Sequence, residues 1–365
     1  MDKPINILRQ WYDRYVSDPQ VVILAVLLVA GFAIMLTFGK MLAPVLAGVV
    51  IAYLLDGLVV KCSQLGAPRM SAVALVFVLF MTVFVFIMLW LIPQLSWQLT
   101  QLVQELPKMI VKGHELLLTL PQEYPNLFTE EQVGDLIAEI RADITAWGQR
   151  VLTLSLPAVF GLMSIMVYLI LVPVLAFFFL KDKHHIIEWF SRGLPKQRRL
   201  VDEVALDVNR QVANYVRGKV WEIFIVGAAS YVTFTVMGLN YALLLATIVG
   251  LSVIIPYIGA AVATLPVALI AWFQWGWNAD FGWLLFAYGV LQALDGYLLV
   301  PLLFSEVVNL HPVAIIIAIL VFGGLWGFWG VFFAIPLATL VNAVLHAWPE
   351  EEAGPETVKT ETGAG

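Results

Sequence analysis

A single aspartate interrupts the apolar run 283–304, within the stretch LQALDGYLLVP. No lysine or arginine occurs between Lys219 and Lys359, so Asp295 has no basic neighbour in this part of the sequence. An acid in an apolar membrane segment is costly and usually faces a cavity or the protein interior. Gln292, three residues earlier, lies on the same helical face. Such a pair could bind a cation, share a proton or hydrogen-bond a polyol.

A structural role is the alternative for Asp295, as a neutral carboxyl that hydrogen-bonds a backbone carbonyl freed by Pro301. The remaining acids near these spans have simpler interpretations. Glu222 starts a span beside Arg217 and Lys219, which favours an interfacial salt bridge over a site. Three further acids fall near span ends and are interpreted in the same way: Asp56, Asp280 and Glu306.

The apolar C-terminal half contains two pairs of short segments. The runs 241–255 and 260–275 are joined by IIPYIGA, and the runs 312–322 and 331–347 are joined by GGLWGFWG. Fifteen residues of helix span about 22 Å, less than the roughly 30 Å of a hydrocarbon core. Irregular backbone at membrane depth is tolerated only where protein buries it or where it lines a cavity. Interrupted segments at matching positions of two halves indicate a transporter binding site.

These features define a candidate site for solute or ion binding and for gating. Tyr257 and either Trp326 or Trp329 could stack on a small polar ligand, with aromatic packing at helix ends as the alternative. The glycines could instead form a small-residue face for helix packing. The site residues are Asp295, Gln292, Pro256, Tyr257, Gly259, Gly323, Gly324, Gly327, Gly330 and Pro336.

The composition requires lipid around the elements that position these residues. Of 365 residues, 61% are hydrophobic and 13% charged, with a mean hydropathy of +0.90; soluble domains are far more charged. The prediction is an all-α polytopic membrane protein with about six full transmembrane helices and two broken or re-entrant hairpins, eight spans in the simplest count. Cys62 is the only cysteine and the histidines form no metal motif, so we expect no disulfide, metal or cofactor. No nucleic-acid partner is expected.

The chain divides by polarity into seven segments. They are a cytoplasmic amphipathic lead (1–19), three transmembrane helices (20–93, with a tight turn near Gly39-Lys40), an external amphipathic helical insert (94–150), a fourth transmembrane helix (151–180), a basic cytoplasmic elbow (181–219), a C-terminal transport core (220–348) and an acidic cytoplasmic tail expected to be disordered (349–365).

Basic residues indicate the orientation. The lead, the 61–69 loop and the 181–219 elbow carry 14 of the 20 lysines and arginines, which predicts that all three are cytoplasmic. Both termini are then cytoplasmic and the insert is external. Within the core, the units 220–275 and 283–347 each combine one span with one broken hairpin. The two units then have opposite orientations, as in an inverted-topology repeat.

The insert is predicted to be helical. In TEEQVGDLIAEIRADI, Thr129 and Gln132 form a capping box, and an apolar stripe follows. The stripe is expected to pack on a neighbouring helix or subunit, and a homo-oligomer is expected because the first spans also have apolar faces to spare.

Several of these segments together resemble the autoinducer-2 exporter family of bacterial permeases, and most closely its PerM-type permeases. They are YVRGK (215–219), IIPYIGA (254–260), the Asp295 region ending in Pro301, and NLHPVAIIIAILVFGGLWGFWGVFFAIPLA (309–338). The resemblance covers nearly the whole chain. Ala260-Ala261 stands where the family often has a proline or glycine, and Asp295 stands where it often has glutamate.

The resemblance implies a secondary transporter of the bacterial inner membrane that is not an enzyme. The family is named for export of autoinducer-2, a small polar molecule, and other members resemble cation/proton antiporters. The substrate, or the monovalent cation or proton exchanged, therefore stays open. Two other functions compete with transport. An intramembrane aspartyl protease would need YD and GxGD contexts that Asp56 and Asp295 lack, and a membrane scaffold in envelope or division processes would act through 94–150.

Overall fold

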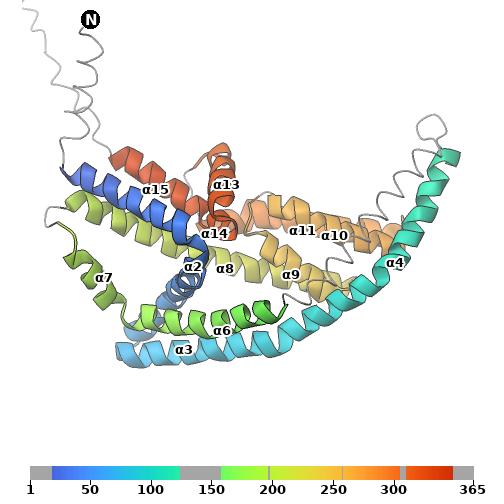
Figure 1. Ribbon diagram of the computed structural model, residues 1–365. Coiled ribbons are helices and arrows are strands. Elements are labelled where there is room, and N and C mark those ends of the chain that lie inside the picture. Colours follow the sequence, from blue (N-terminus) through green and yellow to red (C-terminus); the bar gives the residue numbers. More distant parts are fainter. Residues whose placement is uncertain (1–18, 124–157, 196–197, 257, 305–309, 348–365) are drawn as a thin grey trace, which may run out of the picture. The chain divides into compact units, whose positions relative to one another are not determined.

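A computed structural model describes residues 19–123, 158–195, 198–256, 258–304 and 310–347. Every regular element in these residues is a helix (Figure 1). Six helical segments are long and apolar enough to cross a membrane: Val22–Gly39, Met41–Gln64, Arg69–Gly113, Arg199–Val236, Ile258–Trp275 and Ala279–Phe304. The protein is therefore an all-α polytopic membrane protein, as its composition predicts.

The chain forms two compact units. The first contains Met1–Leu42, His184–Tyr215 and Glu306–Gly365, and the second contains Ala43–Lys183 and Val216–Ser305. Each unit is described by itself below.

Helix α2 runs without interruption over Pro19–Gln64 and includes both of the first two candidate spans. The tight turn expected near Gly39-Lys40 was wrong, since both residues are helical and Gly39 does not have a positive φ. In lipid, a chain reversal leaves backbone groups without water partners, whereas an uninterrupted helix pairs them internally. One glycine costs a helix only about 1 kcal/mol.

In the second unit, one helical run covers both the third span and the start of the insert. It comprises α3 (Arg69–Phe86), the π-turn η1 (Ile87–Leu91) and α4 (Ile92–Glu123). The expected boundary at 93/94 is thus not a helix end, although the insert is helical as predicted as far as Glu123. The capping box at Thr129 lies outside the described residues. Helix α6 (Ala158–Lys181) lies beside α3 (Figure 1).

The basic segment contains the short helix α7 (Lys183–Arg192) and the first half of α8 (Arg199–Val236). Helix α8 passes through position 219 without a break, so the expected boundary between elbow and span is not a helix end either. Within the first unit, Val201 and Val204 are buried against Leu24 of α2.

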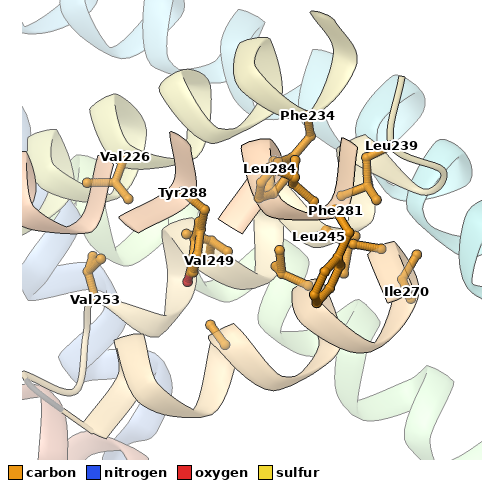
Figure 2. Packing of buried hydrophobic residues seen from close by; sticks show 14 residues of the cluster. Val226, Phe234, Leu239, Leu245, Val249, Val253, Ile270, Phe281, Leu284 and Tyr288 are labelled. Atoms are coloured by element: carbon orange, nitrogen blue, oxygen red, sulfur yellow. The ribbon is translucent and has the colours of Figure 1, made fainter. Parts of the chain in front are cut away.

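The largest apolar cluster lies in the second unit and surrounds the first broken hairpin. Helices α9 (Ala242–Ser252) and α10 (Ile258–Trp275) pack against each other, and α11 (Ala279–Leu294) packs on α10. Figure 2 shows the side chains that fill the space between these helices and α8, among them Phe234, Leu245, Leu284 and Tyr288. After α11 come the π-turn η2 (Asp295–Leu299) and the short helix α12 (Val300–Phe304).

The second broken hairpin lies in the first unit and consists of three helices, α13 (Pro312–Trp326), α14 (Phe328–Phe332) and α15 (Ala334–Ala347). His311 explains the HP pair at its start. Its Nδ1 accepts a hydrogen bond from the Val313 amide, and Pro312 takes the first helical position, where the missing N–H has no partner to lose. Helix α13 packs against both α14 and α15.

Candidate functional site

Asp295 lies where α11 ends and η2 begins. The residue is partly buried, and its Oδ1 atom is fully buried with no hydrogen-bond partner among the described residues. A buried polar atom without a partner is costly, and π-turns occur often at functional sites. The structural alternative for Asp295, a neutral carboxyl that donates to a carbonyl freed by Pro301, stays a prediction.

Gln292 lies one turn before Asp295, but its hydrogen bond goes to a different residue. Its Nε2 donates to the hydroxyl of Tyr288 at 2.5 Å. Tyr288 is 2% exposed, and its hydroxyl lies 3.4 Å from Oγ1 of Thr264 on α10. Figure 2 shows the Tyr288 ring within the apolar cluster, with its hydroxyl oxygen in red. The hydrogen bonds of Gln292, Tyr288 and Thr264 therefore form a polar line that joins α10 to α11, and Gln292 makes no hydrogen bond to Asp295 among the described residues.

Lys219 and Glu222 form an ion pair on α8. Lys219 Nζ lies 2.6 Å from Glu222 Oε2, and the side chains are 4% and 3% exposed. The ammonium also donates to the carbonyl oxygen of Val253 at 3.0 Å and lies 5.0 Å from the Phe304 ring centre. The salt bridge predicted for Glu222 is confirmed, and both of its side chains are buried within the protein.

These charges interact with Asp295. Lys219 attracts the Asp295 carboxylate, and Glu222 repels it. One ammonium therefore faces two carboxylates, so the cluster carries one excess negative charge when all three groups are ionised. A buried site of this charge attracts a proton or a monovalent cation. No group of three metal-ligating side chains occurs in the described part of the chain.

The first break separates α9 from α10 at residues 253–257, where the IIPYIGA motif predicts it. Pro256 lies within the break, and Tyr257 lies outside the described residues. Gly259 packs against the end of α9, and a Cβ added there would lie 1.7 Å from the Ser252 carbonyl oxygen. Lys219 binds the Val253 carbonyl in this break, so the charged cluster and the break are in direct contact.

The second hairpin is interrupted twice, at Gly327 and at Phe333. Gly323 and Gly324 lie inside α13, and the helix ends only at Gly327, which has φ 59° and ψ −133°. Gly330 packs against α13, since a Cβ there would lie 1.8 Å from the Phe322 carbonyl oxygen. Pro336 occupies the first turn of α15, just after the interruption at Phe333, where proline is tolerated.

The tryptophans near the second break pack against other aromatic rings. Trp326 stacks on Phe322 with ring centres 5.6 Å apart and meets the edge of Phe32 at 5.2 Å. Trp329 stacks on Phe333 at 6.1 Å. These contacts favour the packing interpretation over a ligand platform. The second break belongs to the first unit, and the Asp295 cluster belongs to the second.

Sequence reasoning did not assign Lys219, Tyr288 or Thr264 to the candidate site. Lys219 did carry a signal, because it is the last basic residue before a long apolar stretch and stands three residues from Glu222. Tyr288 stands one turn before Gln292, but nothing in its local sequence separates a buried hydroxyl partner from an ordinary membrane tyrosine.

Comparisons with known proteins match this architecture over nearly its full length. The family model described as AI-2E family transporter matches residues 22–350. The chain is 46% identical over 354 residues to the candidate permease PerM of Escherichia coli (strain K12), covering 96% of this chain and 100% of that protein. It is 29% identical over 300 residues to the candidate transport protein YueF of Bacillus subtilis (strain 168), covering 80% of each chain. A second B. subtilis protein named for transport, YrrI, is 25% identical over 309 residues.

Proposed function

Since the chain belongs to the AI-2E transporter family, we propose that it is a secondary permease of the bacterial inner membrane. It moves a small polar solute, autoinducer-2 or a molecule of similar size and polarity, or exchanges cations for protons. Asp295 is the coupling acid, and Lys219 and Glu222 set the charge around it.

One observation carries this proposal. Among the described residues, Asp295 keeps a buried carboxylate oxygen without a hydrogen-bond partner. It lies inside a candidate span and interacts electrostatically with an ammonium that already pairs with Glu222. A purely structural cluster would satisfy each polar atom, because unmet buried groups lower stability. A site that takes up and releases a proton or cation must be incomplete in one of its states.

The proposed mechanism is alternating access, with the two broken hairpins as re-entrant gates on opposite sides of the membrane. The Lys219–Val253 contact supports coupling between the charged cluster and the first gate, because a change in charge at Asp295 alters how strongly Lys219 is held. The half-helix ends at each break would supply dipoles and backbone carbonyls for the solute.

The positive-inside rule supports placing 61–69, 181–219 and the C-terminal tail in the cytoplasm. The lysine and arginine content of the lead supports placing it in the cytoplasm as well. The proposed homo-oligomer would cover the apolar side chains that α2 and α3 expose, which in the membrane also contact lipid.

Transport assays in liposomes test the proposal. The purified protein is reconstituted, and uptake is followed under proton, sodium and autoinducer-2 gradients. We expect flux for the wild-type protein and background flux for Asp295→Asn, with equal insertion and elution volume. Asp280→Asn is the matched control, because Asp280 is exposed at the start of α11 and should keep wild-type flux.

Two outcomes would overturn the proposal: no solute moves under any gradient, or Asp295→Asn transports like the wild type. In a strain that lacks the protein, the scaffold alternative predicts the opposite dependence. In that strain, the Asp295→Asn protein would restore the envelope or division phenotype fully, whereas a protein that lacks 94–150 would not.

A further inference from the structure

Two adjoining cavities lie along α4 where it passes the open ends of the first broken hairpin. The larger has a volume of about 460 Å³ and the smaller about 260 Å³. Both are lined by Glu105, Asn240 and Tyr241. None of the residues lining either cavity belongs to the Asp295 cluster, so this is a separate place in the second unit.

Polar contacts from α4 build the walls of these cavities. Gln98 Oε1 accepts a hydrogen bond from the Leu244 amide at 2.9 Å and so caps the N-terminus of α9. Lys112 Nζ donates to the Phe273 carbonyl at 2.9 Å, near the C-terminus of α10. Helix α4 is thus fastened to both open ends of the hairpin, one by an acceptor and the other by a donor, as the helix dipole favours.

The connection between α8 and α9 is held in a strained conformation at this place. Tyr241 has φ 59°, the only positive φ of a non-glycine residue in the described ranges. Gln274 holds the connection on both sides, accepting from the Asn240 amide and donating to the Gly238 carbonyl, each at 2.8 Å. Strain of this kind costs about 1–3 kcal/mol and is found mostly at binding and switch sites.

The lining of the larger cavity fits a neutral ligand with many hydroxyl groups. Amides come from Gln98, Gln101 and Asn240, hydroxyls from Tyr231 and Thr235, and an indole face from Trp97, which is 59% exposed. These groups donate and accept hydrogen bonds without net charge. Aromatic faces can pack on the C–H face of a small ring.

The charged side chains at this place are of both signs and offset one another. Of the described residues that line the larger cavity, Glu105 alone is charged, and its carboxylate interacts with the Tyr241 hydroxyl. Desolvation, with this interaction, raises the pKa of Tyr241 to about 12, so the hydroxyl stays a donor. Lys108 and Lys112 line the smaller cavity next to it and offset the carboxylate.

We propose that the larger cavity is a binding site for small neutral polyhydroxylated molecules, through which solute is loaded or released beside the first hairpin. This inference rests on the transport function proposed above. A volume of about 460 Å³ lies in the range of small-molecule sites. Gln101 and Trp97 are the specificity-determining residues, because they line the cavity without serving the fold through the contacts described above.

Equilibrium dialysis with the purified full-length protein in nanodiscs tests the site without requiring transport. The probes are ribose and autoinducer-2 as neutral polyols, tetramethylammonium as a cation and inorganic phosphate as an anion. We expect saturable binding of at least one polyol and none of either ion. Gln101→Leu and Trp97→Leu should each weaken polyol binding about tenfold, since each removes a direct contact.

Gln104→Leu is the matched control, as Gln104 stands on the same helix but lines neither cavity, and its binding should equal that of the wild type. Asp295→Asn should bind normally even if its flux is lost, which separates this site from the coupling acid. Binding of tetramethylammonium or phosphate in preference to the polyols, no saturable binding at all, or full affinity in both Gln101→Leu and Trp97→Leu would each overturn the proposal.

Discussion

The ammonium of Lys219 lies 3.0 Å from the main-chain carbonyl oxygen of Val253 and 2.6 Å from the carboxylate of Glu222. Val253 follows the last residue of α9, so its carbonyl has no partner within the helix. One side chain of α8 therefore neutralises a buried acid and also satisfies the backbone at the first break. Its position is fixed by both contacts.

Replacing Lys219 should destabilise the protein strongly. Lys219→Met leaves Glu222 and the Val253 carbonyl buried without a partner, which we expect to cost about 3–5 kcal/mol. The double variant Lys219→Met/Glu222→Leu should recover much of this loss, because no buried charge then lacks its partner. Thermal unfolding, followed by loss of the monodisperse elution peak, ranks the stability of the wild type, Lys219→Met and the double variant.

Lys183→Met is the control for that series. Lys183 pairs with Asp56 at 2.8 Å, but the two side chains are 30% and 19% exposed. We expect a loss near 1 kcal/mol or less, since water solvates the remaining charge. If Lys219→Met and Lys183→Met unfold at the same temperature, then burial does not make the loss of Lys219 more destabilising than the loss of Lys183, which would contradict the prediction.

The close-approach glycines should tolerate no side chain. Gly259→Ala and Gly330→Ala would place a Cβ 1.7 and 1.8 Å from a carbonyl oxygen of the preceding helix, so each hairpin must open. We expect losses of about 1–3 kcal/mol or more in stability, together with loss of flux. The melting temperature measures the loss of stability, and the liposome assay measures the loss of flux.

Gly324→Ala should behave differently from these two. Gly324 lies inside α13 and a Cβ there would meet nothing within 4 Å. Since alanine is the better helix former, we expect equal or higher stability by up to about 1 kcal/mol. A large loss for Gly324→Ala would contradict the packing described for this hairpin.

Gly327 tests backbone conformation instead of packing. A Cβ there has open space, but φ 59° with ψ −133° is a region that only glycine occupies readily. Gly327→Ala and Gly327→Asn should therefore both lower stability by about 1–3 kcal/mol. Asparagine should give no rescue, because this ψ lies outside the left-handed helical region that asparagine tolerates. A melting temperature of Gly327→Asn at the wild-type value would refute the assigned conformation.

Tyr288→Phe tests the polar line beside Asp295. The ring keeps its packing in the cluster of Figure 2, while Gln292 and Thr264 lose a hydroxyl partner. We expect a loss of about 1 kcal/mol in stability and reduced flux in liposomes. Tyr297→Phe should change neither quantity, since Tyr297 is 88% exposed. If the wild type, Tyr288→Phe and Tyr297→Phe transport equally fast, then the hydrogen bonds of Tyr288 have no role in transport.

Much of the fold follows from local features that the sequence displays. Apolar length predicts the spans, because lipid requires every backbone group to be paired within a helix. Proline and glycine at 256 and 327 predict the two breaks, and His311-Pro312 predicts where α13 begins. Asp295 is conspicuous because a charge in such a segment needs an explanation.

Only the tertiary structure decided which groups face that acid. Lys219 reaches Val253 across 34 positions, and Thr264 meets Tyr288 across 24. These contacts depend on how α8, α10 and α11 pack, and side-chain packing has no local signature. The same holds for Gly39, where the sequence suggested a turn but the helix continues. In lipid, a continuous ladder of backbone hydrogen bonds outweighs the weak preference of one glycine for a turn.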